Sequence, residues 1–237
     1  MKRYLITSLL LGSGVVMAEE ANEAPEWQGS IQFGYVASSG NSDNTNLNSK
    51  ANLKHDDENW LHDILVQYYS SSDADTTTAE RYKLSYQGDY KLEDDKHYLF
   101  VNSSYEDDRF SGFDYRATLT AGYGRHLYSN NDMTLDGEVG AGFRYSEETG
   151  TDAENEAMIR VAAKYNWDID EDKKLTSNIS VEEGEEVRVS NFDISFSTMI
   201  VGGVSMKASY EARHVSEVPE GKDKLDTVVS LNLLYSF

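Results

Sequence analysis

The 237-residue sequence contains no cysteine, so the protein has no disulfides, no thiolate chemistry and no lipid-modified cysteine after a leader peptide. Basic residues are also scarce. There are 21 Lys and Arg against 42 Asp and Glu, which gives a formal net charge of −21. The phosphates of a nucleic acid would repel so acidic a chain, and we therefore expect no nucleic-acid partner.

Long apolar runs are missing as well. After Ala18 no segment approaches the roughly 20 apolar residues that a helix needs to cross a bilayer, which excludes a helical membrane protein. The one apolar run, from Leu5 to Val16, follows Lys2 and Arg3 and ends at a small-residue cleavage site. This pattern predicts that residues 1–18 are a signal peptide and that residues 19–237 form an exported domain.

From Trp27 onward the sequence shows period-two alternation, with apolar side chains on one face of each segment and polar ones on the other. The alternation predicts an all-β protein, an antiparallel transmembrane β-barrel of about 12 strands of roughly 9–11 residues each. The segment from Tyr98 to Tyr105 is ambiguous because both of its faces are partly apolar. An even strand number would place both termini in the periplasm.

Aromatic residues gather where the predicted strands end. All three Trp fall at one end, which predicts a membrane girdle there: Trp27, Trp60, Tyr90, Trp167 and Phe237. A second girdle is predicted at the opposite end: Tyr35, Tyr68, Tyr82, Tyr105, Tyr115, Tyr145 and Tyr210. The β propensity of Tyr is the alternative explanation, but it does not account for the grouping of the Trp residues. We therefore expect outer-membrane lipid and lipopolysaccharide as partners. We also expect longer outer loops at residues 70–78, 147–155 and 215–224.

The chain ends in alternating apolar residues that include Tyr235 and Phe237. This ending resembles the assembly signal that the outer-membrane barrel assembly machinery reads, so that machinery is a further expected partner. The location expected from these signals is the outer membrane of a bacterial cell.

Four segments together resemble one known family. They are Ser39-Gly40-Asn41-Ser42, the Tyr-rich stretch from Tyr82 to Tyr90, the run Tyr-Glu-Asp-Asp-Arg-Phe-Ser-Gly at 105–112, and the aromatic C-terminus. They are similar to the YdiY-like salt-induced outer-membrane proteins. The resemblance covers nearly the whole exported domain and implies a barrel in the outer membrane. Because that family is a domain of unknown function, it supplies no catalytic or ligand residues.

Turning the apolar face toward lipid makes the polar face line the lumen. The predicted pore-lining residues carry both signs of charge: Lys50, Lys83, Asp89, Arg116, Asp136, Glu138, Arg160, Lys164, Lys207 and Glu211. Two interpretations stay open. The lumen is either a narrow diffusion channel for small polar solutes or ions, or an interior closed by ion pairs in a non-conducting structural barrel.

An enzyme is the least favoured interpretation. The spacing of His214 and Ser216 resembles the His-x-Ser pairing of outer-membrane lipid hydrolases. No third group is placed to orient the histidine. The histidines lack metal-ligand spacing, and acidic runs such as Glu106-Asp107-Asp108 are interpreted as solvated surface. We therefore expect no enzymatic activity, no cofactor and no metal. The sequence does not indicate an oligomeric state.

Overall fold

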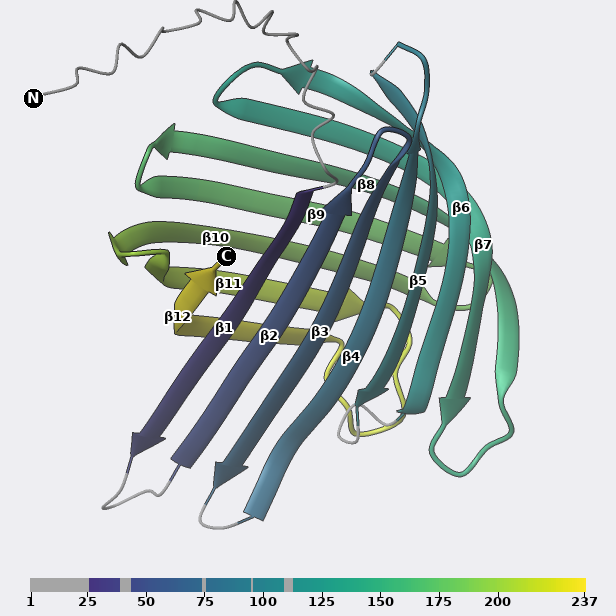
Figure 1. Cartoon of the computed structure of the whole chain (residues 1–237). Helices are drawn as coiled ribbons and strands as arrows, with labels where there is room; N and C mark the ends of the chain where they lie inside the picture. The colour runs from purple at the N-terminus through teal and green to yellow at the C-terminus, as the bar shows by residue number, and fades with distance from the viewer. Residues whose placement is uncertain (1–25, 39–43, 74–75, 95, 109–112) are drawn as a thin grey trace, which may run out of the picture.

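The computed structural model describes residues 26–38, 44–73, 76–94, 96–108 and 113–237. Twelve antiparallel strands form one closed barrel in which each strand pairs with its neighbours in sequence and β12 pairs with β1 (Figure 1). The predicted signal peptide and Ser39-Gly40-Asn41-Ser42 lie outside the described residues. No helix in the described ranges is long and apolar enough to cross a membrane. The strands are β1 (Glu26–Ser38), β2 (Asn44–Asp56), β3 (Trp60–Asp73), β4 (Thr76–Lys91), β5 (His97–Asp108), β6 (Phe113–Ser129), β7 (Met133–Glu148), β8 (Glu154–Asp170), β9 (Lys173–Gly184), β10 (Arg188–Val201), β11 (Val204–Val215) and β12 (Leu225–Ser236).

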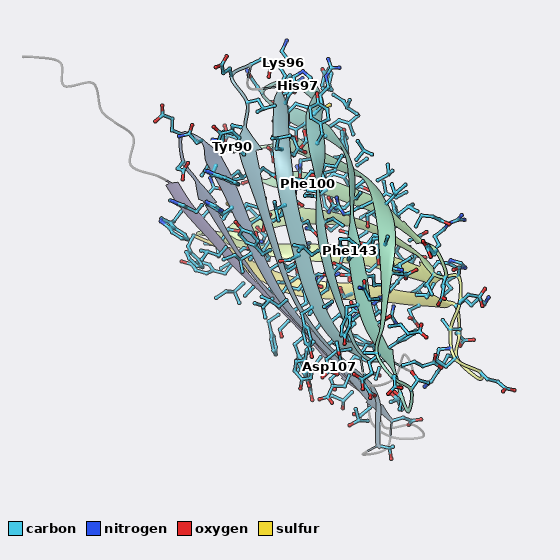
Figure 2. All side chains as sticks on the ribbon, turned by 90° about the vertical axis from the view of Figure 1, so that its right-hand side faces the viewer. Tyr90, Lys96, His97, Phe100, Asp107 and Phe143 are labelled. Carbon is cyan, nitrogen blue, oxygen red and sulfur yellow. The ribbon has the colours of Figure 1, made fainter. Side chains whose placement is uncertain are left out.

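The outer face of the barrel is apolar, as the alternation predicted. Ile31, Leu119 and Leu231 are each more than half exposed, and Phe143 lies on the outer surface of β7 (Figure 2). Buried positions on the described strands are largely polar or charged, the reverse of a water-soluble fold. An apolar outer surface around a polar interior is the arrangement of a membrane barrel. The predicted fold class and strand number are thus confirmed.

All three Trp residues lie at one rim of the barrel, which we call the tryptophan rim. Trp27 is at the start of β1, Trp60 begins β3, and Trp167 near the end of β8 pairs with the first residue of β7. The ring of Trp60 packs edge-on against Tyr90, with 5.2 Å between ring centroids. Because the strand number is even, β1 begins and β12 ends at this same rim. That this rim faces the periplasm stays a prediction.

Outward Tyr rings form a band at the opposite rim, which we call the tyrosine rim. The centroids of Tyr68 and Tyr82 are 4.8 Å apart, and Tyr115 lies 5.9 Å from both Tyr105 and Tyr145. The rings connect β3 with β4 and, further around the barrel, β5 with β6 and β7. Both rims therefore have the aromatic bands expected at lipid–water interfaces.

Short turns join the strands at the tryptophan rim. In the β2–β3 turn, the N–H groups of Trp60 and Asn59 donate to the Asp57 carboxylate at 2.8 and 2.9 Å, which holds the pKa of Asp57 below its ordinary value of 3.8. Gly202 and Gly203 connect β10 to β11 with positive φ angles of 53° and 81°, as a two-residue hairpin turn of this kind requires. At the tyrosine rim, the prediction of a long loop at residues 70–78 is wrong. There, β3 extends to residue 73 and β4 begins at residue 76.

The seam between β1 and β12 is short. It contains four residue pairs, from Ser30–Ser236 to Phe33–Leu233, whereas every other neighbouring strand pair is joined over at least eleven. Phe237 extends it, because its N–H donates to Gly29 O at 2.9 Å and its O accepts from Gly29 N–H at 2.8 Å. A Cβ on Gly29 would overlap the Phe237 ring. The last residue therefore helps to close the barrel.

Candidate functional site in the barrel interior

A cavity of about 840 Å³, here called the lumen cavity, occupies the barrel interior. All ten predicted pore-lining residues lie on inward faces of their strands, and seven of them line this cavity: Lys50, Lys83, Asp89, Asp136, Arg160, Lys164 and Glu211. The other three do not. Arg116 lines a smaller neighbouring cavity, Glu138 is buried beneath its hydrogen-bond donors, and Lys207 shares the inward face of β11 with Glu211.

Glu138 on β7 is the most deeply buried charge of this set, with a side chain that is 0% exposed. Its carboxylate accepts hydrogen bonds from Arg160 at 2.7 Å and from Lys164 at 2.6 Å, both on β8. Gln87 on β4 donates at 2.8 Å and Tyr98 on β5 at 3.0 Å. A buried carboxylate is costly unless it is paired and hydrogen-bonded, and these four donors meet that need.

Glycines of β6 and β7 leave space in the barrel wall for large side chains of β5. A Cβ on Gly124 would overlap the Tyr98 ring, and a Cβ on Gly140 would come within 2.8 Å of Phe100. This packing shows which face of β5, the strand with two partly apolar faces, is inside the barrel. Tyr98 and Phe100 both point inward and are almost fully buried. The glycines at alternate positions of β6 and β7 are a sequence signal for large side chains packed against this part of the wall.

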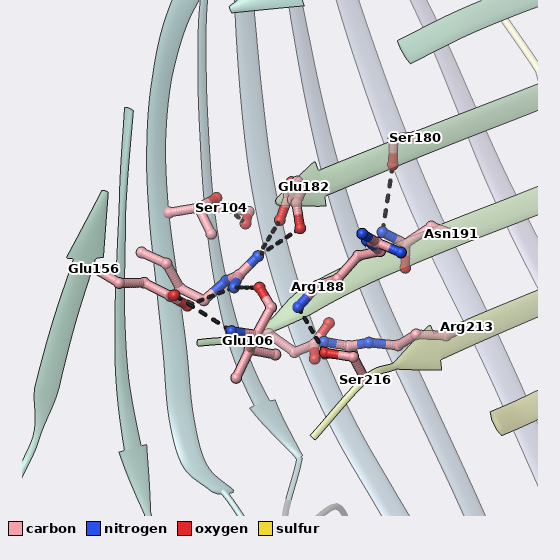
Figure 3. Close-up of polar contacts among 12 residues, drawn as sticks. Ser104, Glu106, Glu156, Ser180, Glu182, Arg188, Asn191, Arg213 and Ser216 are labelled. Atoms are coloured by element: carbon pink, nitrogen blue, oxygen red, sulfur yellow. Dashed lines mark hydrogen bonds and ion pairs between the residues drawn. The ribbon is translucent and has the colours of Figure 1, made fainter. Parts of the chain in front are cut away.

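One ion pair crosses the lumen, and we call it the cross-lumen pair. Arg213 on β11 donates to the carboxylate of Glu106 on β5 (Figure 3). These strands are six positions apart in either direction around the twelve-stranded barrel, so the pair joins opposite walls. The interpretation of Glu106 as solvated surface is wrong, because its side chain is only 8% exposed. Glu106 shares the inward face with Phe100, and the mixed pattern of this strand concealed that from sequence reasoning.

Further basic groups surround the cross-lumen pair. Lys83 Nζ lies 4.0 Å from the Glu106 carboxylate, and Arg116 is opposite Glu106 in the β5–β6 register. Arg144 on β7 donates to Glu156 at 2.6 Å and to the backbone oxygen of residue 187 at 2.8 Å. Its contact with Glu156 ties the wall to the β9–β10 turn, where the N–H of residue 186 donates to Glu156 at 3.1 Å.

Elsewhere in the lumen, charges are also paired across strands that are not neighbours. Lys50 on β2 donates to Glu211 on β11, three positions away around the barrel. Between the neighbouring strands β6 and β7, near the tryptophan rim, His126 and Asp136 are also in contact at 2.5 Å. The interior thus combines ion pairs with open space, and each of the two interpretations of the lumen describes part of it.

The part of the chain that the structure describes does not show the pairing of His214 with Ser216 that a lipid hydrolase requires. The hydroxyl of Ser216 accepts a hydrogen bond from the backbone N–H of Arg188 at 2.8 Å (Figure 3), and within the described residues it has no hydrogen bond with His214. Over the same ranges no group of three His, Asp or Glu side chains is arranged to hold a metal ion.

Comparison with known proteins places the chain in a family. Residues 31–237 match the model of the protein family of unknown function DUF481. The chain belongs to the DUF481 family. One relative is the uncharacterized protein YdiY of Escherichia coli (strain K12), which is 27% identical over 222 residues, covering 93% of this chain and 87% of that protein. The resemblance inferred from the four sequence segments is therefore confirmed.

Solved structures support the architecture of this DUF481 member. The NanC porin aligns with a TM-score of 0.51 and 10% identity, over 88% of this chain and 97% of that one. An outer-membrane channel from Pseudomonas putida F1 aligns with a TM-score of 0.50 and 11% identity, over 89% and 95% of the two chains. At these identities the likeness establishes the barrel fold, which known outer-membrane porins and channels share.

Proposed function

We propose that the protein is an outer-membrane barrel that provides a narrow diffusion path for small polar solutes or ions. The lumen cavity carries this proposal. A barrel of eight strands is filled by its own side chains, whereas this barrel of twelve keeps about 840 Å³ open. The cavity is lined from His97 and His126 near the tryptophan rim to Glu106 and Arg213 at the cross-lumen pair. Charged walls of both signs can solvate a polar solute.

The apolar outer face and the two aromatic bands support the proposed location in the outer membrane. The two aligned solved structures, a porin and an outer-membrane channel, agree with this location. In this location the path would connect the tryptophan rim with the tyrosine rim.

A non-conducting structural barrel is the second candidate, and the cross-lumen pair favours it. Glu106 and Arg213 join opposite walls, so they narrow the path at their level. Charges that are buried in pairs can also serve only to hold the walls together.

Conductance in planar bilayers distinguishes the candidates. We expect the refolded protein without residues 1–18 to produce small current steps. The double variant Glu106→Ser/Arg213→Ser removes both members of the cross-lumen pair and leaves the net charge of the lumen unchanged, so its steps should be larger. The matched control is Glu183→Ser/Arg188→Ser, which removes a Glu–Arg pair that is about half exposed at the tyrosine rim, and its steps should equal those of the wild type. Silence of both the wild type and the first double variant would establish the structural barrel instead.

A further inference from the structure

Beside the cross-lumen pair lies a second cavity of about 40 Å³, which we call the side cavity. In a chain with a net charge of −21 its lining is unusual, because basic side chains outnumber acidic ones by four to two. The basic residues are Lys83, Arg116, Arg144 and Arg213, the acidic ones are Glu106 and Glu182, and Ser104, Thr118, Asn191 and Val189 complete the lining.

We propose that the side cavity is a binding site for a small carboxylate anion. A volume of 40 Å³ has room for about three water molecules, which corresponds to a carboxylate the size of formate. The planar guanidinium of arginine matches a carboxylate in geometry as well as in charge. In the structure Glu106 already presents such a group to Arg213, which shows that the geometry is suitable.

The donors for such an anion are identifiable. Arg213 uses a terminal nitrogen for Glu106, while its Nε is buried without a hydrogen-bond partner. Lys83 is at the outer limit of an ion pair with Glu106, at 4.0 Å, and its side chain is 31% exposed. Arg144, in contrast, is committed to Glu156 and to the backbone of residue 187. Arg213 and Lys83 are therefore the groups that would contact the anion, and Glu106 is its competitor.

The side cavity is next to the lumen cavity, because six residues line both: Lys83, Ser104, Glu106, Glu182, Asn191 and Arg213. A solute in the lumen thus reaches the site at the level where the cross-lumen pair narrows the path. The inference deepens the proposed function, since an anion site at that level would make the path selective for anions. Binding itself can be measured whether or not the barrel conducts.

Calorimetric titration of the refolded protein with sodium formate, at constant ionic strength set with sodium chloride, tests the site. We expect Glu106→Gln to bind formate about tenfold more tightly than the wild type, because the competing charge is removed, equivalent to roughly 1.4 kcal/mol. Glu183→Gln removes an Arg-paired carboxylate at the outer surface and should bind formate as the wild type does. Lys83→Gln changes a side chain that is 31% exposed and should weaken binding several-fold.

Equal formate affinity in the wild type, Glu106→Gln and Lys83→Gln would overturn the site, as would a complete lack of binding. If Glu106→Gln does not refold, the decrease in Lys83→Gln relative to Glu183→Gln decides the question alone. The outcome is separable from the proposed function. Formate binding by a barrel that is silent in bilayers would reject the channel and keep the site, whereas a conducting barrel without formate binding would reject only the site.

Discussion

The buried charge of Glu138 gives the sharpest test of how the interior is stabilised. Replacing Arg160 and Lys164 together by Gln leaves the carboxylate with only two neutral donors, Gln87 and Tyr98. Removing the partners of a truly buried charge costs roughly 3–5 kcal/mol. Most of this loss should come from Arg160, because its side chain is 8% exposed and that of Lys164 is 30% exposed.

Adding Glu138→Gln to this double variant should restore most of the lost stability. The triple variant no longer contains an uncompensated charge, and the amide oxygen at position 138 still accepts from Tyr98. A matched control is Lys174→Gln, whose ion pair with Asp168 is about half exposed at the tryptophan rim, so its effect should be near the limit of detection. The assay is urea unfolding of protein refolded into lipid vesicles, followed by Trp fluorescence.

Unfolding of Arg160→Gln/Lys164→Gln at the same urea concentration as Lys174→Gln would contradict a cost of the unpaired charge. That result would mean that water reaches Glu138 and solvates the charge. A triple variant no more stable than the double variant would also contradict it, because the loss would then come from packing of the long side chains rather than from an unpaired carboxylate.

Two further predictions concern the ends of the strands. Deletion of Phe237 removes its ring and both backbone hydrogen bonds to Gly29, so membrane insertion should slow and the protein should accumulate in the periplasm. The control Phe237→Ala removes the ring but keeps those hydrogen bonds. Normal outer-membrane levels of both variants in cell fractions would exclude an assembly role. The amide NMR signals of Asn59 and Trp60 should titrate with a midpoint below 3.8, because their N–H groups hold the Asp57 carboxylate in its charged form. A carboxyl group whose pKa is lowered by folding stabilises the fold above its unfolded pKa, and this stabilisation is lost as the pH falls through the folded pKa. The β2–β3 turn should therefore loosen only in strong acid. A titration midpoint at or above 3.8 would contradict this prediction.

The barrel could be predicted from the sequence because the alternation within each strand separates its apolar face from its polar face. In β1, Ile31 and Phe33 alternate with polar residues, and the structure places both side chains on the outer surface. The same reasoning failed for β5, since alternation separates two faces without saying which one is inside. Tyr98 and Phe100 are inside because Gly124 and Gly140 leave space there, and that complementarity lies in the neighbouring strands.

The candidate site could be predicted only in part. The period-two alternation of β11 predicts that Arg213 points inward. It does not predict which residue Arg213 contacts across the lumen. Its partner Glu106 is 107 positions away, and the two meet because a closed barrel of twelve strands places β5 opposite β11. The partners of Glu138 likewise come from β4, β5 and β8. Such contacts depend on register and closure, which no single strand encodes.

Charged side chains have different roles at the two ends of the lumen. Near the tryptophan rim, four donors satisfy the Glu138 carboxylate, so little of its field extends into the lumen. At the cross-lumen pair four basic side chains face two acidic ones, and Arg213 keeps a donor without a partner. A charge that is fully paired stabilises the wall, whereas an excess charge attracts ions of the opposite sign. Substitutions around Glu138 should therefore change stability first, and substitutions around Glu106 should change anion binding and selectivity first.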